Sequence, residues 1–306
     1  MSEYDVVVVG GSAAGLSAAL VLSRARRRVL VVDSGAPRNA PASHMHGFLS
    51  RDGVPPPDLL AVGRHEVRTY GGEVREGSVT HVARADPGEF TVSLSDGREV
   101  SSRRLVLATG LRDELPDLPG LSDRWGRDVL HCPYCHGREV EDQPLGVLGD
   151  GPDSVRYAQI VRQWSDDVVL FIPAGVVSAE QRIGLDARGV QVVEGVVNGV
   201  TVEDDRLTGV TLADGSTVER AAVFLPPHLV PNNDLAAQLD CALDPDGWVV
   251  TDAAGATSVT GVWAAGNVTN PKAQVVTAAG EGSAAAIDLN ADLVDEDVRV
   301  AADSAR

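Results

Sequence analysis

The sequence predicts an α/β protein with two Rossmann-like nucleotide-binding domains, each a βαβ unit followed by a β-meander, the second inserted into the first. Two observations lead to this class. Segments 5–33 and 145–172 each contain a short apolar run, a glycine-rich turn, a helical stretch and a second apolar run, which is the order of a βαβ unit. Alternating segments separated by turn residues follow each unit, as expected of antiparallel strands.

The first βαβ unit begins with the valine-rich run Asp5–Gly10, continues in a predicted helix over Ala13–Arg24 and returns in the run Val29–Asp33. An antiparallel meander is predicted from Gly71 to Thr109. The proline-rich stretch Leu115–Gly120 that follows is interpreted as a linker, which places a domain boundary near residue 115.

The second βαβ unit has strands at Leu145–Gly149 and Val168–Ile172 and a helix over Ser154–Trp164. A further meander is expected over Val190–Leu225, and a last helix from about Gln274 to Leu293. The predicted domains are 1–114 and 229–306, two parts of one dinucleotide-binding domain, and 115–228, an inserted NAD(P)-binding-like domain that carries the C-x-x-C motif. The acidic tail at 295–297 is interpreted as a solvated helix end.

Charge and composition exclude several classes of protein. The formal net charge is −18, which repels phosphate backbones, and no basic stripe is present, so nucleic acid is not an expected partner. No run of 18 apolar residues could span a membrane. Three cysteines and an N-terminus that runs directly into a strand-like segment indicate a cytoplasmic protein rather than a disulfide-stapled secreted one.

The turn at 10–15 is a candidate site for the pyrophosphate of a dinucleotide. Its amides and the following helix N-terminus can face the phosphates, and Gly15 lets the helix pack close to the strand. Asp33 lies 18 residues after Gly15, near the spacing of a carboxylate that binds the adenosine ribose, whereas Ser12 stands where glycine is usual. The candidate loop residues are Gly10, Gly11, Ser12, Ala13, Ala14 and Gly15.

The corresponding loop of the second unit, Gly149–Ser154, is a poorer site for an anion. Asp150 and Asp153 place negative charge there, and Pro152 has no amide hydrogen. The next strand ends without the acid that selects a ribose hydroxyl or the arginine that receives a 2′-phosphate. The second domain has either kept nicotinamide binding or lost it while retaining the fold, so NADPH is a doubtful cofactor.

The segment His131–Gly137 reads HCPYCHG and contains the candidate catalytic residues Cys132, Cys135 and His136. A C-x-x-C turn can form a readily exchanged disulfide, and flanking histidines can favour the thiolate or move protons. Zinc binding and a structural disulfide are the alternatives. Redox chemistry is favoured because no second cysteine–histidine pair follows at zinc-site spacing and because a cytoplasmic chain rarely keeps structural disulfides. No metal is expected.

Taken together, these landmarks resemble the low-molecular-weight thioredoxin reductase family of FAD proteins over nearly the whole chain. The narrower motif Cys-Pro-Tyr-Cys-His-Gly, with 37–39 and 43–47, is similar to the flavin-dependent dithiol oxidases that close disulfides in natural products of the holomycin and gliotoxin type. The other matching residues are Ala108-Thr109-Gly110, Pro231-Asn232 and Ala264-Ala265-Gly266.

The resemblance implies roles for individual residues. Cys135 would face the flavin, Cys132 would exchange with the substrate thiol, and His136 would handle protons in place of the family's aspartate. Gly266 would approach the FAD diphosphate, and Asn267 stands where the family has aspartate. Further residues expected to bind FAD are Arg38, Asn39, Ala108, Thr109, Gly110, Gln274 and Val275.

The leading hypothesis is therefore a dithiol oxidase that forms a disulfide in a small-molecule dithiol and reduces O2 to H2O2. The alternatives are an NADPH-dependent reductase of a thioredoxin-like protein and a redox-sensing flavoprotein. The resemblance also implies a homodimer. His44 and His46 either line the substrate cleft or lie in an exposed loop, and Cys241 is expected to be a small buried residue.

Overall fold

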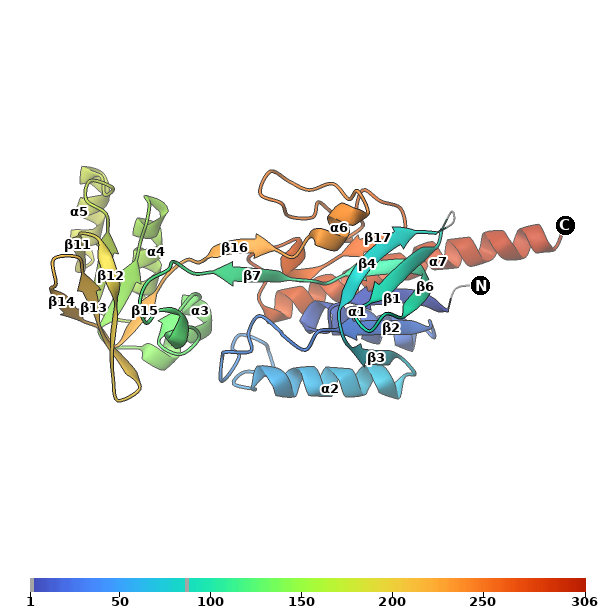
Figure 1. Cartoon of the computed structure of the whole chain (residues 1–306), viewed down its shortest axis with the longest axis horizontal. Helices are drawn as coiled ribbons and strands as arrows, with labels where there is room; N and C mark the ends of the chain where they lie inside the picture. Colours follow the sequence, from blue (N-terminus) through green and yellow to red (C-terminus); the bar gives the residue numbers. More distant parts are fainter. Residues whose placement is uncertain (1–2, 86–87) are drawn as a thin grey trace. The chain divides into compact units, whose positions relative to one another are not determined.

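The computed structural model describes residues 3–85 and 88–306, which divide into two compact units (Figure 1). Residues 1–2 and 86–87 of the predicted first domain lie outside the described residues. Unit 1 comprises Met1–Ala40, Phe48–Arg112 and Leu229–Arg306, and unit 2 comprises Pro41–Gly47 and Asp113–His228. The short segment 41–47 thus groups with unit 2, although the sequence analysis assigned it to the first domain. The predicted α/β class is confirmed.

A mixed sheet forms the centre of unit 1. In the described chain it contains, in order, β3 (Glu73–Glu76), β2 (Val29–Asp33), β1 (Tyr4–Val9), β6 (Glu99–Leu107), β5 (Phe90–Leu94) and β4 (Val79–Arg84), with β17 (Val262–Ala264) also paired to β6. The strands β4, β5 and β6 are antiparallel, as predicted. The assignment of 73–76 to that meander was wrong: β3 pairs parallel with β2, because the unpredicted helix α2 (Pro56–Thr69) carries the chain back across the sheet.

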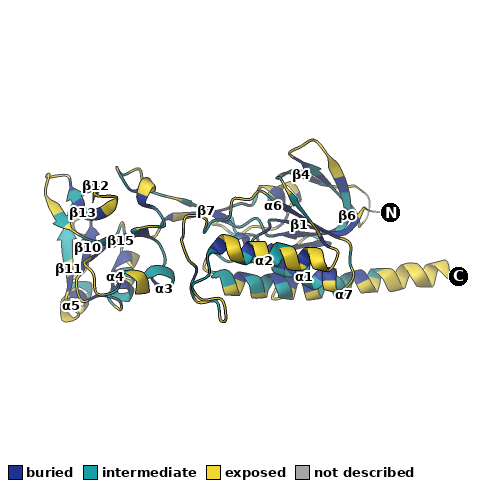
Figure 2. Ribbon diagram, turned by 90° about the horizontal axis from the view of Figure 1, so that it is seen from below, coloured by how far each residue is buried: buried dark blue, intermediate teal, exposed yellow. Residues whose placement is uncertain are grey.

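The two faces of this sheet are covered by different elements. On one face, alternate residues of β1 such as Val6 and Val8 pack with α1 (Ala13–Arg24) and α7 (Val275–Ser304). On the other face, Val7 and Val9 pack with the β4–β6 meander and the short helix α6 (Asp234–Gln238). Figure 2 shows the buried strands and the exposed C-terminal part of α7. The last helix is therefore longer than the predicted 274–293, because its final turns lie beyond the core.

Unit 2 is built on a second parallel sheet. Its order in the described residues is β11 (Val190–Glu194), β10 (Val168–Ile172), β9 (Leu145–Leu148), β15 (Ala222–Phe224) and β8 (Val129–Leu130), with α4 (Asp153–Val161) and α5 (Ala179–Ala187) between strands along the chain. Only β12 (Val197–Glu203), β13 (Arg206–Leu212) and β14 (Thr217–Glu219) form an antiparallel meander. The predicted meander over 190–225 was therefore too long at both ends, where β11 and β15 join the parallel sheet.

The remaining elements of the described chain are short. The strands β7 (Leu111–Glu114) and β16 (His228–Pro231) pair with each other. The helical turns are η1 (Ser122–Arg124), α3 (Pro133–His136), η2 (Arg138–Val140) and η3 (Gly266–Val268). The predicted boundary near residue 115 follows β7 directly.

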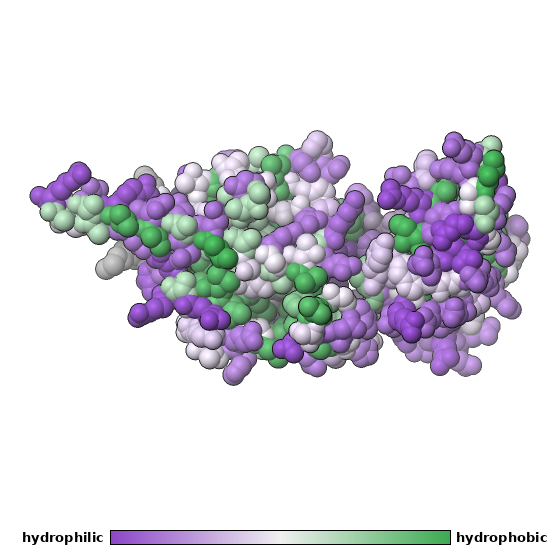
Figure 3. Space-filling model, turned by 180° about the vertical axis from the view of Figure 1, so that it is seen from behind, coloured by the Kyte–Doolittle hydropathy of each residue, from purple (hydrophilic) through white to green (hydrophobic). Residues whose placement is uncertain are grey.

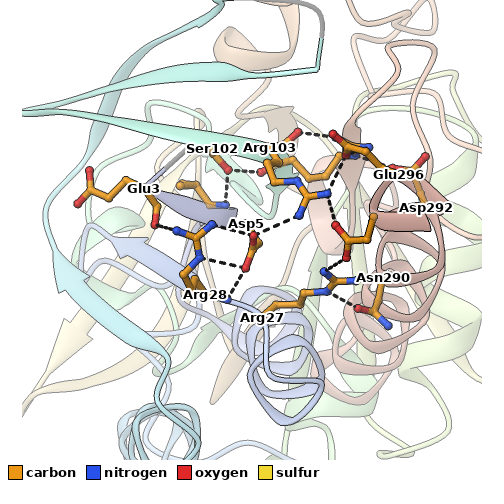
Figure 4. A network of polar contacts seen from close by, with 12 residues as sticks. Glu3, Asp5, Arg27, Arg28, Ser102, Arg103, Asn290, Asp292 and Glu296 are labelled. Atoms are coloured by element: carbon orange, nitrogen blue, oxygen red, sulfur yellow. Dashed lines mark hydrogen bonds and ion pairs between the residues drawn. The ribbon is translucent and has the colours of Figure 1, made fainter. Parts of the chain in front are cut away.

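A polar network joins β1, β6 and α7 in unit 1 (Figure 4). Asp5 is buried, which favours a higher pKa, but hydrogen bonds from Arg28 and Arg103 outweigh burial and hold the pKa of Asp5 below its usual range. Arg103 also lies 3.1 Å from Glu296 and 2.6 Å from Asp297. The interpretation of 295–297 as merely solvated was therefore wrong, since two of its three acids pair with arginines of the sheet.

Exposed apolar side chains line part of α7. Figure 3 shows hydrophobic side chains on the surface towards the C-terminus. The exposed apolar residues of α7 include Ile287, Val294 and Val298. Their spacing of seven and four residues places them on one helix face. No partner chain is present on this face of the described chain, and the homodimer stays a prediction. No helix among the described residues has the length and apolar character needed to span a membrane.

The contact between α1 and α7 yields a stability prediction. A Cβ added at Gly282 would lie 2.0 Å from the Ala14 carbonyl oxygen, so Gly282→Ala must push the two helices apart. We expect a loss of about 1–3 kcal/mol in the free energy of unfolding, measured by urea denaturation.

Gly280→Ala is the matched control on the same helix, because a Cβ at the exposed Gly280 would meet nothing within 4 Å. We expect this variant to gain up to about 1 kcal/mol from higher helix propensity. Equal stability of the two variants would contradict the assigned contact.

Candidate active site

The first glycine-rich loop lies between β1 and α1. Gly10 has φ +104°, and a Cβ there would lie 2.2 Å from the Ala108 carbonyl oxygen at the end of β6. A Cβ on Gly15 would lie 1.8 Å from the carbonyl oxygen of Gly10. Side chains at these positions would therefore separate the loop, the helix and the sheet. Ser12 is the N-cap residue of α1 and makes no side-chain cap, so the first amides of the helix are not capped by it.

Asp33 ends β2 beside this loop. A Cβ on Gly11 would lie 2.7 Å from Asp33 Oδ2, so the carboxylate occupies the space that a larger residue would need. Asp33 Oδ1 accepts a hydrogen bond from the Gly35 amide, and Oδ2 lies 2.8 Å from Arg64 Nη2. A carboxylate has about four acceptor positions, so these contacts leave capacity for ribose hydroxyls. The sequence analysis missed Arg64 because it did not predict α2.

A cavity of about 840 Å³ opens next to the loop within unit 1. Its size is typical of a cofactor site. Gly10 and Ser34 line one part of it, and Val79, Thr109 and Asn232 line another. The cavity therefore joins the glycine loop to the end of β6.

The segment 108–110 is tied to Asn232 by three hydrogen bonds. Asn232 Nδ2 donates to the Thr109 carbonyl at 2.8 Å, Thr109 Oγ1 donates to the Asn232 carbonyl at 2.7 Å, and the Asn232 amide donates to the Gly110 carbonyl at 3.0 Å. These contacts hold Thr109 at the wall of the cavity, and its neighbours Ala108 and Gly110 are not among the lining residues.

The remaining candidate cofactor residues lie in η3, at the start of α7 and in the loop after β2. Gly266 has φ +79°, and its amide donates to Glu281 Oε2 at 3.0 Å. Asn267 Nδ2 donates to the backbone carbonyls of Asn270 and Ala273. The side-chain oxygen Oδ1 of Asn267 is therefore the atom that a cofactor could contact. The sequence analysis missed Glu281, which no motif marks. Gln274 is the N-cap of α7 and Val275 its first residue, while Arg38 and Asn39 lie half-buried in the loop after β2.

The redox segment forms a tight turn in unit 2. Cys132 precedes the four-residue helix α3, which starts with Pro133, a residue suited to a first helical position. The amides of Cys135 and His136 both donate to the Cys132 carbonyl at 3.1 Å. Both cysteines are half-buried. The turn thus brings Cys132, Cys135 and His136 together, as their spacing predicts.

Burial and two titratable neighbours act on the pKa of His136. Burial lowers its pKa, the nearby Glu139 carboxylate opposes this effect, and His46 adds to the lowering. His46 Nε2 lies 3.2 Å from Glu139 Oε1, so segment 41–47 reaches the region after the redox turn within unit 2. His44 is exposed. Of the two loop histidines, the structure therefore brings only His46 to the neighbourhood of His136.

Two further expectations concern the remaining cysteine and metals. Cys241 is buried in the core of unit 1, as predicted. The part of the chain that the structure describes holds no group of three or more histidine, cysteine, aspartate or glutamate residues arranged to bind a metal ion.

The first glycine loop with its adjoining cavity and the C-x-x-C turn define a dinucleotide-binding protein with a cysteine pair placed for redox chemistry. The chain belongs to the pyridine nucleotide-disulphide oxidoreductase family, whose pattern it matches over residues 4–282. It is 33% identical to thioredoxin reductase sirT of Leptosphaeria maculans, over 94% of each chain. The predicted resemblance to the thioredoxin reductase family is thereby confirmed, and the protein is an oxidoreductase that acts on sulfur groups.

Solved structures agree with this assignment. HlmI superimposes with a TM-score of 0.95 at 58% identity, over 99% of this chain and 96% of that chain. An oxidoreductase from Agrobacterium tumefaciens gives a TM-score of 0.89 at 38% identity, over 96% and 99%. The family implies a bound FAD, and the residues of unit 1 fit one: glycines clear space at the loop, a carboxylate ends β2, and a cavity adjoins both.

We predict that Asp33→Asn weakens FAD binding. Loss of the negative charge removes charge-assisted hydrogen bonds to the ribose, each worth about 1.5–3 kcal/mol, so the dissociation constant should rise by about tenfold or more. Fluorescence titration of the apoprotein with FAD measures this. Asp58→Asn, an exposed change on α2, is the control. Equal affinity in the two variants would remove Asp33 from the site.

We also predict a pH-dependent stability due to His136. Burial lowers its folded pKa below the ordinary 6.5, so the unfolded chain binds the proton more readily. The contribution of a neutral His136 to the free energy of unfolding is therefore complete above about pH 6.5, and it is lost as the pH falls towards the folded pKa. Urea denaturation of His136→Asn should show a smaller loss than the parent between about pH 7.5 and 5.5. Parallel curves would mean that His136 is not the source.

Proposed function

We propose that this protein is a dithiol oxidase. It would close a disulfide in a small-molecule dithiol through a Cys132–Cys135 redox disulfide, with O2 as final electron acceptor. The observation that carries this choice over an NADPH-dependent reductase is the chemistry of the second nucleotide loop.

That loop is occupied by its own side chains and acids. The amide of Asp150 donates to Ser154 Oγ at 3.3 Å, and the N-cap position of α4 is Pro152, which has no amide hydrogen. Asp150 and Asp153 are exposed beside it, where they would repel a pyrophosphate. These features support a domain that retains the fold without a strong site for a dinucleotide phosphate.

The basic residue nearest along the chain to the second unit's ribose position is also engaged. No arginine or lysine lies between the end of β10 and Arg182 on α5. Arg182 Nη2 lies 2.9 Å from Glu194 Oε1 at the end of β11. A partner carboxylate makes Arg182 a weaker receptor for the 2′-phosphate that distinguishes NADPH. This pairing favours thiols over NADPH as the electron source.

The cysteine pair can perform the chemistry with balanced electrons. One substrate thiolate attacks the disulfide and forms a mixed disulfide with Cys132, releasing Cys135 as a thiolate. The second substrate thiol then displaces Cys132, so the substrate leaves as a disulfide, having given up two electrons and two protons. FAD, when bound, supplies the acceptor for these two electrons and their passage to O2, which yields H2O2.

His136 is suited to the proton traffic of this exchange. Because burial lowers its pKa, the imidazole is neutral near pH 7 and can accept a proton from an attacking thiol. His136 directly follows Cys135, and the backbone amides of both residues donate to the Cys132 carbonyl. A neutral base at this position avoids placing a negative charge near a thiolate.

The test is anaerobic mixing of the FAD-loaded protein with dithiothreitol, a small dithiol, and separately with NADPH. We expect dithiothreitol to bleach the flavin absorbance, NADPH to do so far more slowly, and aerobic turnover to yield one H2O2 per disulfide. Cys135→Ser should slow dithiothreitol-driven bleaching by at least about 100-fold. Cys241→Ser, a change in the core of unit 1, is the control.

Rapid bleaching by NADPH together with turnover of a thioredoxin would instead establish a reductase. A flavin that neither reagent reduces would point to a redox sensor.

A further inference from the structure

The helix α4 contacts the redox segment just before its first cysteine. Tyr157 lies in the middle of α4, and its hydroxyl donates a hydrogen bond to the backbone carbonyl of His131. His131 directly precedes Cys132, so the phenol fixes the backbone where the chain enters the turn. The two bonded residues are 26 positions apart in sequence, which makes this a tertiary contact rather than a local one.

Trp164, in the turn after α4, contacts the redox turn and the residues that follow it. Trp164 makes an edge-to-face contact with Tyr134, with ring centroids 5.5 Å apart and planes at 87°. A Cβ added at Gly137 would lie 2.6 Å from the Trp164 ring. The Trp164 carbonyl also accepts a hydrogen bond from the Asp142 amide at 2.8 Å. The redox turn is thus held on both sides of its cysteines.

Tyr157 lies in α4, and Trp164 lies in the turn that follows the helix. Both aromatic side chains contact the redox segment, Tyr157 through the His131 carbonyl and Trp164 through the Tyr134 ring. The sequence analysis predicted a helix here but assigned neither residue to the site.

The phenol is also electrostatically close to both sulfurs. Burial raises the pKa of Tyr157 well above its ordinary value, and negative charge on Cys132 and on Cys135 raises it further. The hydroxyl therefore stays protonated and remains a donor at every physiological pH. Because the interaction is mutual, any change at position 157 alters the surroundings of both thiolates.

We propose that Tyr157 is a positioning residue for the redox pair, which anchors the backbone before Cys132 and contributes a neutral polar group to the surroundings of the two sulfurs. The inference rests on the proposed function, because it assumes that the pair exchanges with thiols. It assigns to α4 a role in thiol chemistry that is independent of any nucleotide at its N-terminus.

The test is Tyr157→Phe in the FAD-loaded protein, which removes one oxygen and keeps the ring. Loss of the hydroxyl leaves the sulfurs in a more apolar environment, which disfavours the thiolate. After reduction, we expect alkylation of Cys132 and Cys135 by iodoacetamide near pH 7 to slow by about threefold or more, with the midpoint of the pH profile moved to higher pH. Mass spectrometry follows both cysteines.

The control is Tyr70→Phe, which removes an exposed phenol of unit 1 and should alkylate at the parent rate. Thermal denaturation of Tyr157→Phe shows whether the fold is retained. Trp164→Phe, which keeps a ring against Gly137, applies the same alkylation measurement to the contact of Trp164 with the redox turn. Superimposable pH profiles of the parent and Tyr157→Phe would overturn the assignment.

The measurement needs neither substrate nor O2, so it separates this inference from the proposed function. Titration of the parent against glutathione redox buffers tests whether Cys132 and Cys135 form a disulfide at all. Failure to form one would overturn the proposed function, whereas a normal disulfide with unchanged alkylation in Tyr157→Phe would overturn only the role of Tyr157.

Discussion

The close approach of backbones around the first glycine loop is the constraint on which unit 1 depends. Gly10, Gly15 and Gly282 each leave space that a Cβ would fill, against β6, the loop itself and α1. Because α7 can approach α1 at Gly282, the loop between β17 and α7 is brought to the same side of the sheet as the glycine turn. The positions of the two loops that are candidates to contact the FAD diphosphate, 10–15 and the loop between β17 and α7, therefore depend on these three glycines.

Much of the fold could be predicted from the sequence because its βαβ units are local. Valine-rich runs with glycine turns specify strand, turn and helix within about 30 residues. What could not be predicted depends on distant partners. The helix α2 buries few of its residues, so its apolar pattern is weak, and β3 becomes parallel only because α2 returns the chain. The tail acids gain their partners only when the fold places Arg103 and Arg104 of β6, and Arg27 after α1, beside the last helix.

The same distinction applies to the candidate site. Cys132, Cys135 and His136 occupy one turn, so their spacing is sufficient to predict their proximity. Arg64 beside Asp33, Glu281 beneath the Gly266 amide and Tyr157 beside His131 come from other elements, and no residue pattern in the chain marks them. The sequence thus indicates which groups react, whereas the groups that orient them become visible only when helices and strands are packed together.

The position of α4 gives the βαβ unit of unit 2 a structural role that would remain if, as proposed, its loop no longer binds phosphate. In this fold the N-terminus of such a helix faces the dinucleotide, but the flank of α4 carries Tyr157 and leads to Trp164, which hold the redox turn. Asp150 and Pro152 lie at the N-terminal end of α4, whereas Tyr157 lies in the middle of the helix. Loss of nucleotide binding therefore need not disturb the cysteines, whereas loss of α4 would remove the support on which their geometry depends.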